Sequence, residues 1–176
     1  MIVVVNDTNI FIDLYKTSLL DAFFQLPYEF HTVDFVIHEI ENSEQKQAVN
    51  QHIEDKKLVV KTFVVQELAT IQQIKTQAGH HLSFTDCAVW HYAHENGFTL
   101  LTGDNPLRTY ALAAGTSVHG ILFVFDQLVE HAIISKKEAA DKAETLLRIN
   151  PRLPRSIFLD RIDTATAPKS PTSNNN

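Results

Sequence analysis

The chain begins with a run of apolar, β-branched residues, and shorter runs of the same kind recur along it. Residues 2–5 are Ile-Val-Val-Val, the pattern of a strand that is buried on both faces of a parallel sheet. Asn6 and Asp7 end this first run. Further strands are predicted at 30–33, at 58–60, at 99–102 and within 117–125.

Between the strands, apolar residues recur at helical spacing, and residues that favour helix ends flank several of these stretches. Asp7 and Thr8 offer N-cap chemistry to a first helix, and Pro27 ends a second helical stretch, 19–26. Ser83-Phe84-Thr85-Asp86 has the pattern of a capping box, and Gly97 ends the helix that follows it. The remaining helices are predicted at 35–54, at 65–78, from the turn 103–106 to Ala114, and from Asp126 onward.

Strands that alternate with helices at these spacings are typical of α/β proteins. We therefore expect a three-layer α/β/α sandwich with a mainly parallel central sheet. The length of 176 residues favours one main domain. The single cysteine, Cys87, excludes an intramolecular disulfide framework and a Cys-rich zinc site. Neither the apolar start nor the run 120–125 approaches the roughly 20 residues that span a bilayer, so we expect a cytoplasmic protein without a membrane segment.

The net charge of −6 is unevenly distributed along the chain. Residues 1–134 carry 7 basic and 16 acidic side chains, a net charge of −9, whereas residues 135–176 carry 8 and 5, a net charge of +3. We expect a body at 1–134, a basic helical extension at 135–163 and a disordered tail at 164–176, which is rich in Thr, Ala, Pro, Ser and Asn.

Four acidic residues stand where the carboxyl edge of the predicted sheet would gather them. Asp7 directly follows the first strand, and Asp104 follows the strand at 99–102. Glu39 comes about one helical turn after the second strand, and Asp86 lies in the first turn of its helix. Ligands of open α/β sheets bind outside the carboxyl ends of the strands. The four side chains are therefore expected to converge.

Clustered carboxylates repel one another, and each raises the pKa of the others unless a cation holds them ionised. Oxygen ligands suit Mg²⁺ or Mn²⁺, and such an ion can generate hydroxide and neutralise charge on a phosphate. The pattern thus favours a metal site for phosphodiester hydrolysis. Each acid also has a purely structural interpretation: Asp7 as a helix cap, Asp86 as part of the capping box, Asp104 as a turn residue and Glu39 as a solvated helix residue.

Short segments around these acids resemble motifs of the PIN-domain family, in the same order. The segments are 4–14, 36–40, 82–88 and 100–105, and Gly120-Ile121-Leu122 resembles the family's closing strand. The resemblance covers residues 2–134. It implies a PIN-like fold and a Mg²⁺- or Mn²⁺-dependent nuclease, most often an endoribonuclease that leaves a 5′-phosphate and a 3′-hydroxyl.

The resemblance also implies a role for each site residue. Asp7, Glu39, Asp86 and Asp104 would form the catalytic, metal-binding pocket. Asp7 and Asp104 would be the main direct ligands of the metal, with Asp86 beside them, whereas Glu39 would bind it through water or help to activate the attacking water. Asn9 and Thr102 would orient the first and last acids.

The resemblance extends to possible partners. Many small bacterial PIN proteins are homodimeric toxins of toxin–antitoxin pairs, so RNA, an antitoxin protein and a second copy of the chain are the expected partners. The basic segment beyond residue 134 departs from the shortest such toxins.

Several alternatives remain to be weighed. A PIN-like domain can instead be an inactive module that binds protein or RNA. A haloacid-dehalogenase phosphatase would need an acid where Asn9 stands, and the acidic pair and lysine of a receiver domain are missing from the sequence pattern. Phe11, Phe23 and Phe24 belong either to the core or to a dimer interface.

Basic and imidazole side chains offer two further candidate sites. Arg148, Arg152, Arg155 and Arg161 either hold RNA phosphates or form a solvated extension that packs on the acidic body. His91 and His94 share a helix face, but the sequence offers no third metal ligand for them. Since the acidic pocket repels phosphate until a cation binds, we expect RNA binding to depend on metal.

Overall fold

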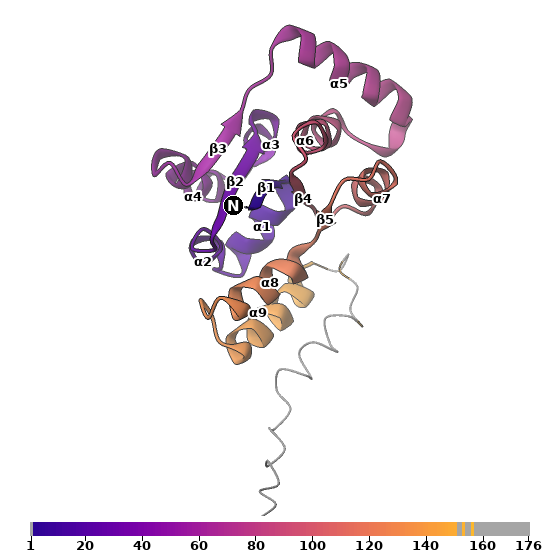
Figure 1. Cartoon of the computed structure of the whole chain (residues 1–176). Helices are drawn as coiled ribbons and strands as arrows, with labels where there is room; N and C mark the ends of the chain where they lie inside the picture. Colours follow the sequence, from indigo (N-terminus) through magenta and orange to yellow (C-terminus); the bar gives the residue numbers. More distant parts are fainter. Residues whose placement is uncertain (1, 151–152, 154–155, 157–176) are drawn as a thin grey trace, which may run out of the picture.

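The computed structural model describes residues 2–150, 153 and 156. The described residues form a five-stranded sheet at the centre of the molecule (Figure 1). Its strands are β1 (Ile2–Asn6), β2 (Tyr28–Val33), β3 (Leu58–Lys61), β4 (Thr99–Leu101) and β5 (Val118–His119), in the order β3-β2-β1-β4-β5. Every neighbouring pair is parallel. The predicted α/β class with a parallel sheet is confirmed.

Helices connect consecutive strands and cover the sheet. They are α1 (Thr8–Lys16), α2 (Leu20–Phe23), α3 (Asp34–Glu39), α4 (Ser43–Glu54), α5 (Val65–Ala78), α6 (Phe84–Glu95), α7 (Asn105–Ala113), α8 (Ile121–Glu130) and α9 (Lys136–Ile149), with the short 3-10 helix η1 (Gly79–His81) before α6.

The strand order reverses direction at β1. The chain passes from β1 through β2 to the edge strand β3, and then crosses back to β4 and β5 on the other side of β1. Since parallel crossovers are right-handed, the connections before β3 and after β3 cover opposite faces of the sheet. α1 accordingly contacts α2 and α4, whereas α6 contacts β1, β2 and β4. The carboxyl ends of β1 and β4 form a topological switch point, where such folds bind their ligands.

The core confirms the apolar interpretation of the first strand. Val4 and Val5 are fully buried, as the continuous β-branched run predicts, whereas Ile2 is 54% exposed and Val3 is half-buried. Phe11, Phe23 and Phe24 are also buried, and the rings of Phe23 and Phe30 have their centroids 4.5 Å apart. These phenylalanines therefore belong to the core.

Two predicted elements have different boundaries in the structure. The single helix expected at 35–54 is divided into α3 and α4, because Ile40 is extended and the side chain of Asn42 caps α4 by accepting from the Gln45 amide at 2.9 Å. The strand expected within 117–125 ends at His119, so 120–122 is not a strand and α8 begins before Asp126. The buried residues of α8 do have helical spacing: Ile121, Val124, Phe125 and Leu128.

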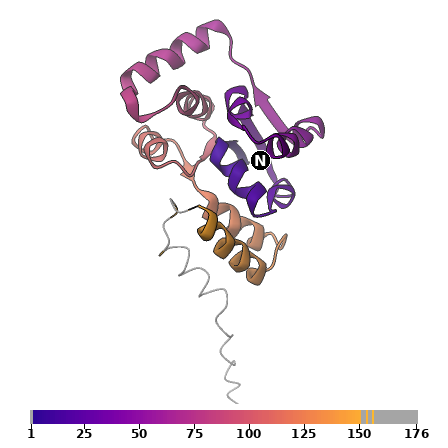
Figure 2. The same cartoon turned by 180° about the vertical axis from the view of Figure 1, so that it is seen from behind.

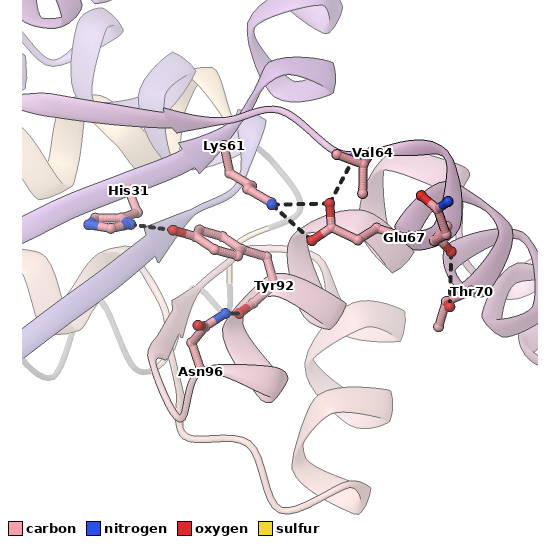
Figure 3. A network of polar contacts seen from close by, with 8 residues as sticks. His31, Lys61, Val64, Glu67, Thr70, Tyr92 and Asn96 are labelled. Atoms are coloured by element: carbon pink, nitrogen blue, oxygen red, sulfur yellow. Dashed lines mark hydrogen bonds and ion pairs between the residues drawn. The ribbon is translucent and has the colours of Figure 1, made fainter.

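α5 packs against α6 and lies at the opposite end of the molecule from α8 and α9 (Figures 1 and 2). Its only buried side chain among the described residues is Ile71. Figure 3 shows how the start of α5 is tied to the sheet: the ammonium group of Lys61 on β3 lies 2.8 Å from Glu67 Oε1, and Glu67 Oε2 accepts from the Val64 amide at 2.8 Å. The same view shows the imidazole of His31 beside the hydroxyl of Tyr92, on β2 and α6.

α9 packs against α8, as both views of the fold show (Figures 1 and 2). Four of its side chains are buried: Ala140, Ala143, Leu146 and Leu147. Asn150 at its end donates to both carboxylate oxygens of Asp13 on α1, at 3.1 and 3.2 Å.

The tail predicted at 164–176 lies outside the described residues. Within the described part of the chain, none of the helices combines the length and apolar character needed to cross a membrane.

Candidate functional site

Asp7 stands at the switch point between β1 and β4. Its amide donates to the Leu101 carbonyl at 3.0 Å, which joins the ends of the two strands. The backbone is extended (φ −85°, ψ 160°), as an N-cap residue requires, and α1 starts with the next residue. The side chain is 3% exposed, so its carboxylate depends on the protein for hydrogen-bond partners.

Three donors supply those partners. Oδ1 of Asp7 accepts from the Thr8 amide at 2.7 Å. Oδ2 accepts from Nδ2 of Asn9 and from the hydroxyl of Thr102, each at 2.7 Å. Asn9 and Thr102, expected beside the first acid, are therefore in contact with it. These bonds fix the orientation of the carboxylate.

Asp104 lies two residues after Thr102, in the turn between β4 and α7. It is the N-cap of α7, its Oδ1 accepts from the Leu107 amide at 2.8 Å, and its own amide donates to Oγ1 of Thr102 at 3.0 Å. Between the two residues, the Gly103 amide donates to Oδ1 of Asn9 at 2.7 Å. Thr102 and Asn9 thus connect the Asp7 carboxylate to the backbone that carries Asp104.

Glu39 and Asp86 complete the set of predicted acids. Glu39 is exposed at the last position of α3, and its Oε2 accepts from the hydroxyl of Thr8 at 2.8 Å. Asp86 forms the predicted capping box: its Oδ2 accepts from the Ser83 amide at 2.6 Å, and the Ser83 hydroxyl accepts from the Asp86 amide at 2.9 Å.

The four acids lie near enough to one another for their charges to interact. Burial raises the pKa of Asp7 from 3.8 to about 7, repulsion from Asp86 and Glu39 adds to this effect, and hydrogen bonds from Thr102 and Thr8 oppose it. Burial also raises the pKa of Asp86, with further repulsion from Asp104 and Glu39. Each of the four acids therefore acts on at least one of the others through its charge.

The chemistry of these donors fits a hard divalent cation. Within the described part of the chain, no three His, Cys, Asp or Glu side chains stand together as a ready-made ligand group. Mg²⁺ nevertheless retains several waters and needs only one or two direct carboxylates. Asp86 and Asp104 each use one carboxylate oxygen to cap a helix, and among the described residues their other oxygens accept no hydrogen bond. These oxygens are suited to contact an ion directly or through water.

Arg148 and His94, two other predicted features, contact residues other than the four acids. Arg148 is exposed on α9 and pairs with Glu144 at 3.0 Å, whereas Arg152, Arg155 and Arg161 lie outside the described residues. His94 stacks on Trp90, with ring centroids 4.9 Å apart, and its Nδ1 lies 3.1 Å from the Thr116 hydroxyl.

The sequence pattern does not predict the contacts that two further residues, Thr8 and Arg108, make at the site. The sequence pattern assigns Thr8 only to helix capping, yet its amide donates to Asp7 and its hydroxyl donates to Glu39. Arg108 donates from Nη2 to the Thr102 carbonyl at 2.9 Å. Its position four residues after Asp104 on a helix was the available signal, because such residues share a helix face.

Comparisons with known proteins agree with this architecture. A family model described as a PIN domain matches residues 3–166. The crystal structure of PAE2754 from Pyrobaculum aerophilum is similar, with a TM-score of 0.52 and 15% sequence identity over 73% of this chain and 98% of that chain. At this identity the likeness concerns the fold alone. No curated protein matches the chain.

Proposed function

This chain belongs to the PIN-domain family, and we propose that it is a divalent-metal-dependent endoribonuclease. PIN domains are commonly nucleases and generally use divalent metal ions. The proposal is supported mainly by the charge interactions among four acids that follow or face the carboxyl ends of the strands: Asp7 with Asp86 and Glu39, and Asp86 with Asp104 and Glu39. A structural role alone explains the helix caps, but it does not explain why these acids lie near enough to repel one another.

In the proposed site, Asp7, Asp86 and Asp104 hold Mg²⁺ or Mn²⁺. Such an ion, when bound, activates water and neutralises charge on the scissile phosphate. Thr102 and Asn9 keep the Asp7 carboxylate in one orientation through the two bonds to Oδ2. Glu39 is exposed and is oriented by the Thr8 hydroxyl, so its carboxylate is suited to accept a proton from the attacking water. The products are a 5′-phosphate and a 3′-hydroxyl.

Metal-dependent binding of RNA follows from the same charges. Residues 1–134 have a net charge of −9, and the four acids would repel a phosphodiester in the absence of a cation. Binding of a divalent ion removes this repulsion at the point where the phosphate must lie. RNA affinity should therefore fall when EDTA is added.

The test is cleavage of structured RNAs with Mg²⁺, Mn²⁺ or EDTA. Asp104→Asn should abolish Mn²⁺-dependent cleavage, because it removes the charge. It should leave the fold intact, because Asn is as good an N-cap as Asp. Asp141→Asn, an equivalent change at an exposed position on α9, should cleave at the wild-type rate. Undiminished cleavage by the Asp104 variant would refute the site.

The alternative, an inactive PIN-like module that binds protein or RNA, makes a different prediction. An active pocket is stabilised thermally by millimolar Mn²⁺, and an inactive pocket is not. If the wild type shows neither Mn²⁺-dependent stabilisation nor cleavage, the binding-module interpretation replaces the enzyme.

We further propose that the enzyme acts as the homodimeric toxin of a toxin–antitoxin pair. The support is the family membership. A gene for a small DNA-binding protein just upstream would favour this role. Co-expression with that protein should relieve growth arrest caused by the chain alone, and the Asp104→Asn variant should cause no arrest.

A further inference from the structure

Arg108 contacts the backbone on which the proposed site is built. The residue lies on α7, one helical turn after Asp104, and its Nη2 donates to the Thr102 carbonyl at 2.9 Å. The guanidinium is half-buried, and burial lowers its pKa. Among the described residues it forms no ion pair with a carboxylate. The contact of this half-buried cation with the Thr102 carbonyl therefore needs an explanation other than charge pairing.

Thr102, the partner of Arg108, connects two of the proposed metal ligands. Its hydroxyl donates to Oδ2 of Asp7 and accepts from the Asp104 amide. Its amide donates to the His119 carbonyl at 3.0 Å. The peptide groups of Thr102 are thus held by β5 on one side and by Arg108 on the other. A shift of this residue would move both acids.

Gly120 makes the room that Arg108 occupies. A Cβ at this position would lie 2.6 Å from Nη2 of Arg108, which is closer than real contacts permit. The backbone of Gly120 is extended (φ −117°, ψ −172°), a conformation that any residue adopts. The glycine thus matters for space and not for its conformation, since a Cβ would push the flexible end of Arg108 away from the Thr102 carbonyl. We call Arg108 and Gly120 a matched pair, because the missing side chain at Gly120 leaves the space in which the guanidinium reaches the Thr102 carbonyl.

We propose that Arg108 is a positioning residue of the metal site: it holds Thr102, and through Thr102 it sets the orientation of Asp7 and Asp104. The inference rests on the proposed function for its metal, but the contacts that carry it exist without metal. Groups that orient metal ligands typically account for 10–100-fold in metal affinity or activity.

The first test uses the metal-free protein. Arg108→Ala should speed amide hydrogen exchange at Gly103 and Asp104 by about ten-fold or more, the effect of losing a hydrogen bond from a charged donor. Arg108→Lys keeps a donor and should restore part of the protection. Arg148→Ala is the matched control, since it removes an exposed arginine paired with Glu144. Unchanged exchange in Arg108→Ala would overturn the proposal.

The second test measures Mn²⁺ affinity by calorimetry. Arg108→Ala should weaken Mn²⁺ binding by about 10–100-fold. Gly120→Ala should have a similar effect because its Cβ displaces the guanidinium. In the Arg108→Ala background the same glycine change should add little, since the side chain it would displace is gone. Additive losses in the double variant would contradict the matched pair.

The outcomes separate this inference from the proposed function. If the wild type binds no Mn²⁺ and cleaves no RNA, the proposed function fails, whereas the exchange experiment still decides whether Arg108 orders the turn. If the wild type binds Mn²⁺ and Arg108→Ala binds it equally well, the positioning role is wrong. A rise in KM for RNA with unchanged kcat and unchanged Mn²⁺ affinity would instead identify Arg108 as a direct phosphate contact and would also overturn the proposal.

Discussion

Asp7, the N-cap of α1, and Asp13, within α1, are both buried acids, but only Asp7 lies in the proposed metal site. Burial raises the pKa of Asp7 from 3.8 to about 7 and that of Asp13 from 3.8 to about 6. The perturbation is Asp7→Asn or Asp13→Asn in metal-free protein. Each substitution removes the titrating group. Its effect on stability must therefore change with pH.

The sign follows from proton uptake. Both pKa values are higher in the folded than in the unfolded chain, so between the two values the folded state binds more protons and the free energy of unfolding falls as the pH rises. For Asp7 the window runs from about pH 4 to about pH 7. At about 1.4 kcal/mol per pH unit, the wild type loses about 4 kcal/mol across it. For Asp13 the loss is about 3 kcal/mol and ends near pH 6.

The assay is urea unfolding in EDTA from pH 4 to pH 7.5. The free energy of unfolding of Asp7→Asn, minus that of the wild type, should rise by about 4 kcal/mol over this range. The Asp13→Asn difference should rise by about 3 kcal/mol. Because only differences between pH values are used, the loss of hydrogen bonds in each variant largely cancels.

Saturating Mn²⁺ then distinguishes the two acids. At pH 7.5 the ion should restore stability to the wild type and to Asp13→Asn, since it binds the ionised pocket of the folded state. Asp7→Asn should respond weakly or not at all. The reasoning is refuted if the Asp7→Asn and wild-type curves run parallel in EDTA, or if Mn²⁺ stabilises all three proteins equally.

Three further predictions concern the site, the basic segment and the core. Thr102→Val should weaken Mn²⁺ binding by about 10–100-fold in calorimetry, because the hydroxyl that contacts Asp7 is lost. Reversing the charge of Arg152 and Arg155 should weaken RNA binding and flatten its salt dependence by about 0.7 in slope per lost phosphate contact, with unchanged Mn²⁺ affinity, as filter binding at several salt concentrations would show. Phe23→Ala should lower the free energy of unfolding by about 3–5 kcal/mol in urea titrations, since the ring is fully buried.

The sequence predicts those parts of the fold that local patterns determine. The β-branched run at 2–5 and the capping box at Ser83 and Asp86 both have the structure expected of them. The sequence pattern does not predict the break between α3 and α4, because helical spacing continues on both sides of it. The Asn42 cap nevertheless starts a separate helix there. The start of α8 was misplaced because a short apolar run does not distinguish a strand from a buried helix.

The candidate site also has one part that the sequence predicts and another part that it does not. Asp7 and Asp104 each follow a strand, so a parallel sheet brings them to the same edge whatever the details of the helices. The contact of Thr8 with Glu39 joins residues 31 positions apart, and it depends on where α3 lies over the sheet. The contact of Arg108 with the Thr102 carbonyl depends on the absence of a side chain at Gly120. Neither contact follows from a local pattern, and the catalytic roles of the four acids stay predictions.

The structural and catalytic interpretations of the acids are compatible, because the caps help to explain how the charges are brought together. Asp7, Asp86 and Asp104 stand at the N-termini of α1, α6 and α7. The positive ends of helix dipoles favour carboxylates, and each cap bond uses only part of the acceptor capacity of its carboxylate. Helix starts at one edge of the sheet can therefore hold acids near enough for their charges to interact before any ion binds. Burial is the main cause of the raised pKa values of Asp7 and Asp86, and the repulsion that adds to it is the interaction that a divalent cation would relieve.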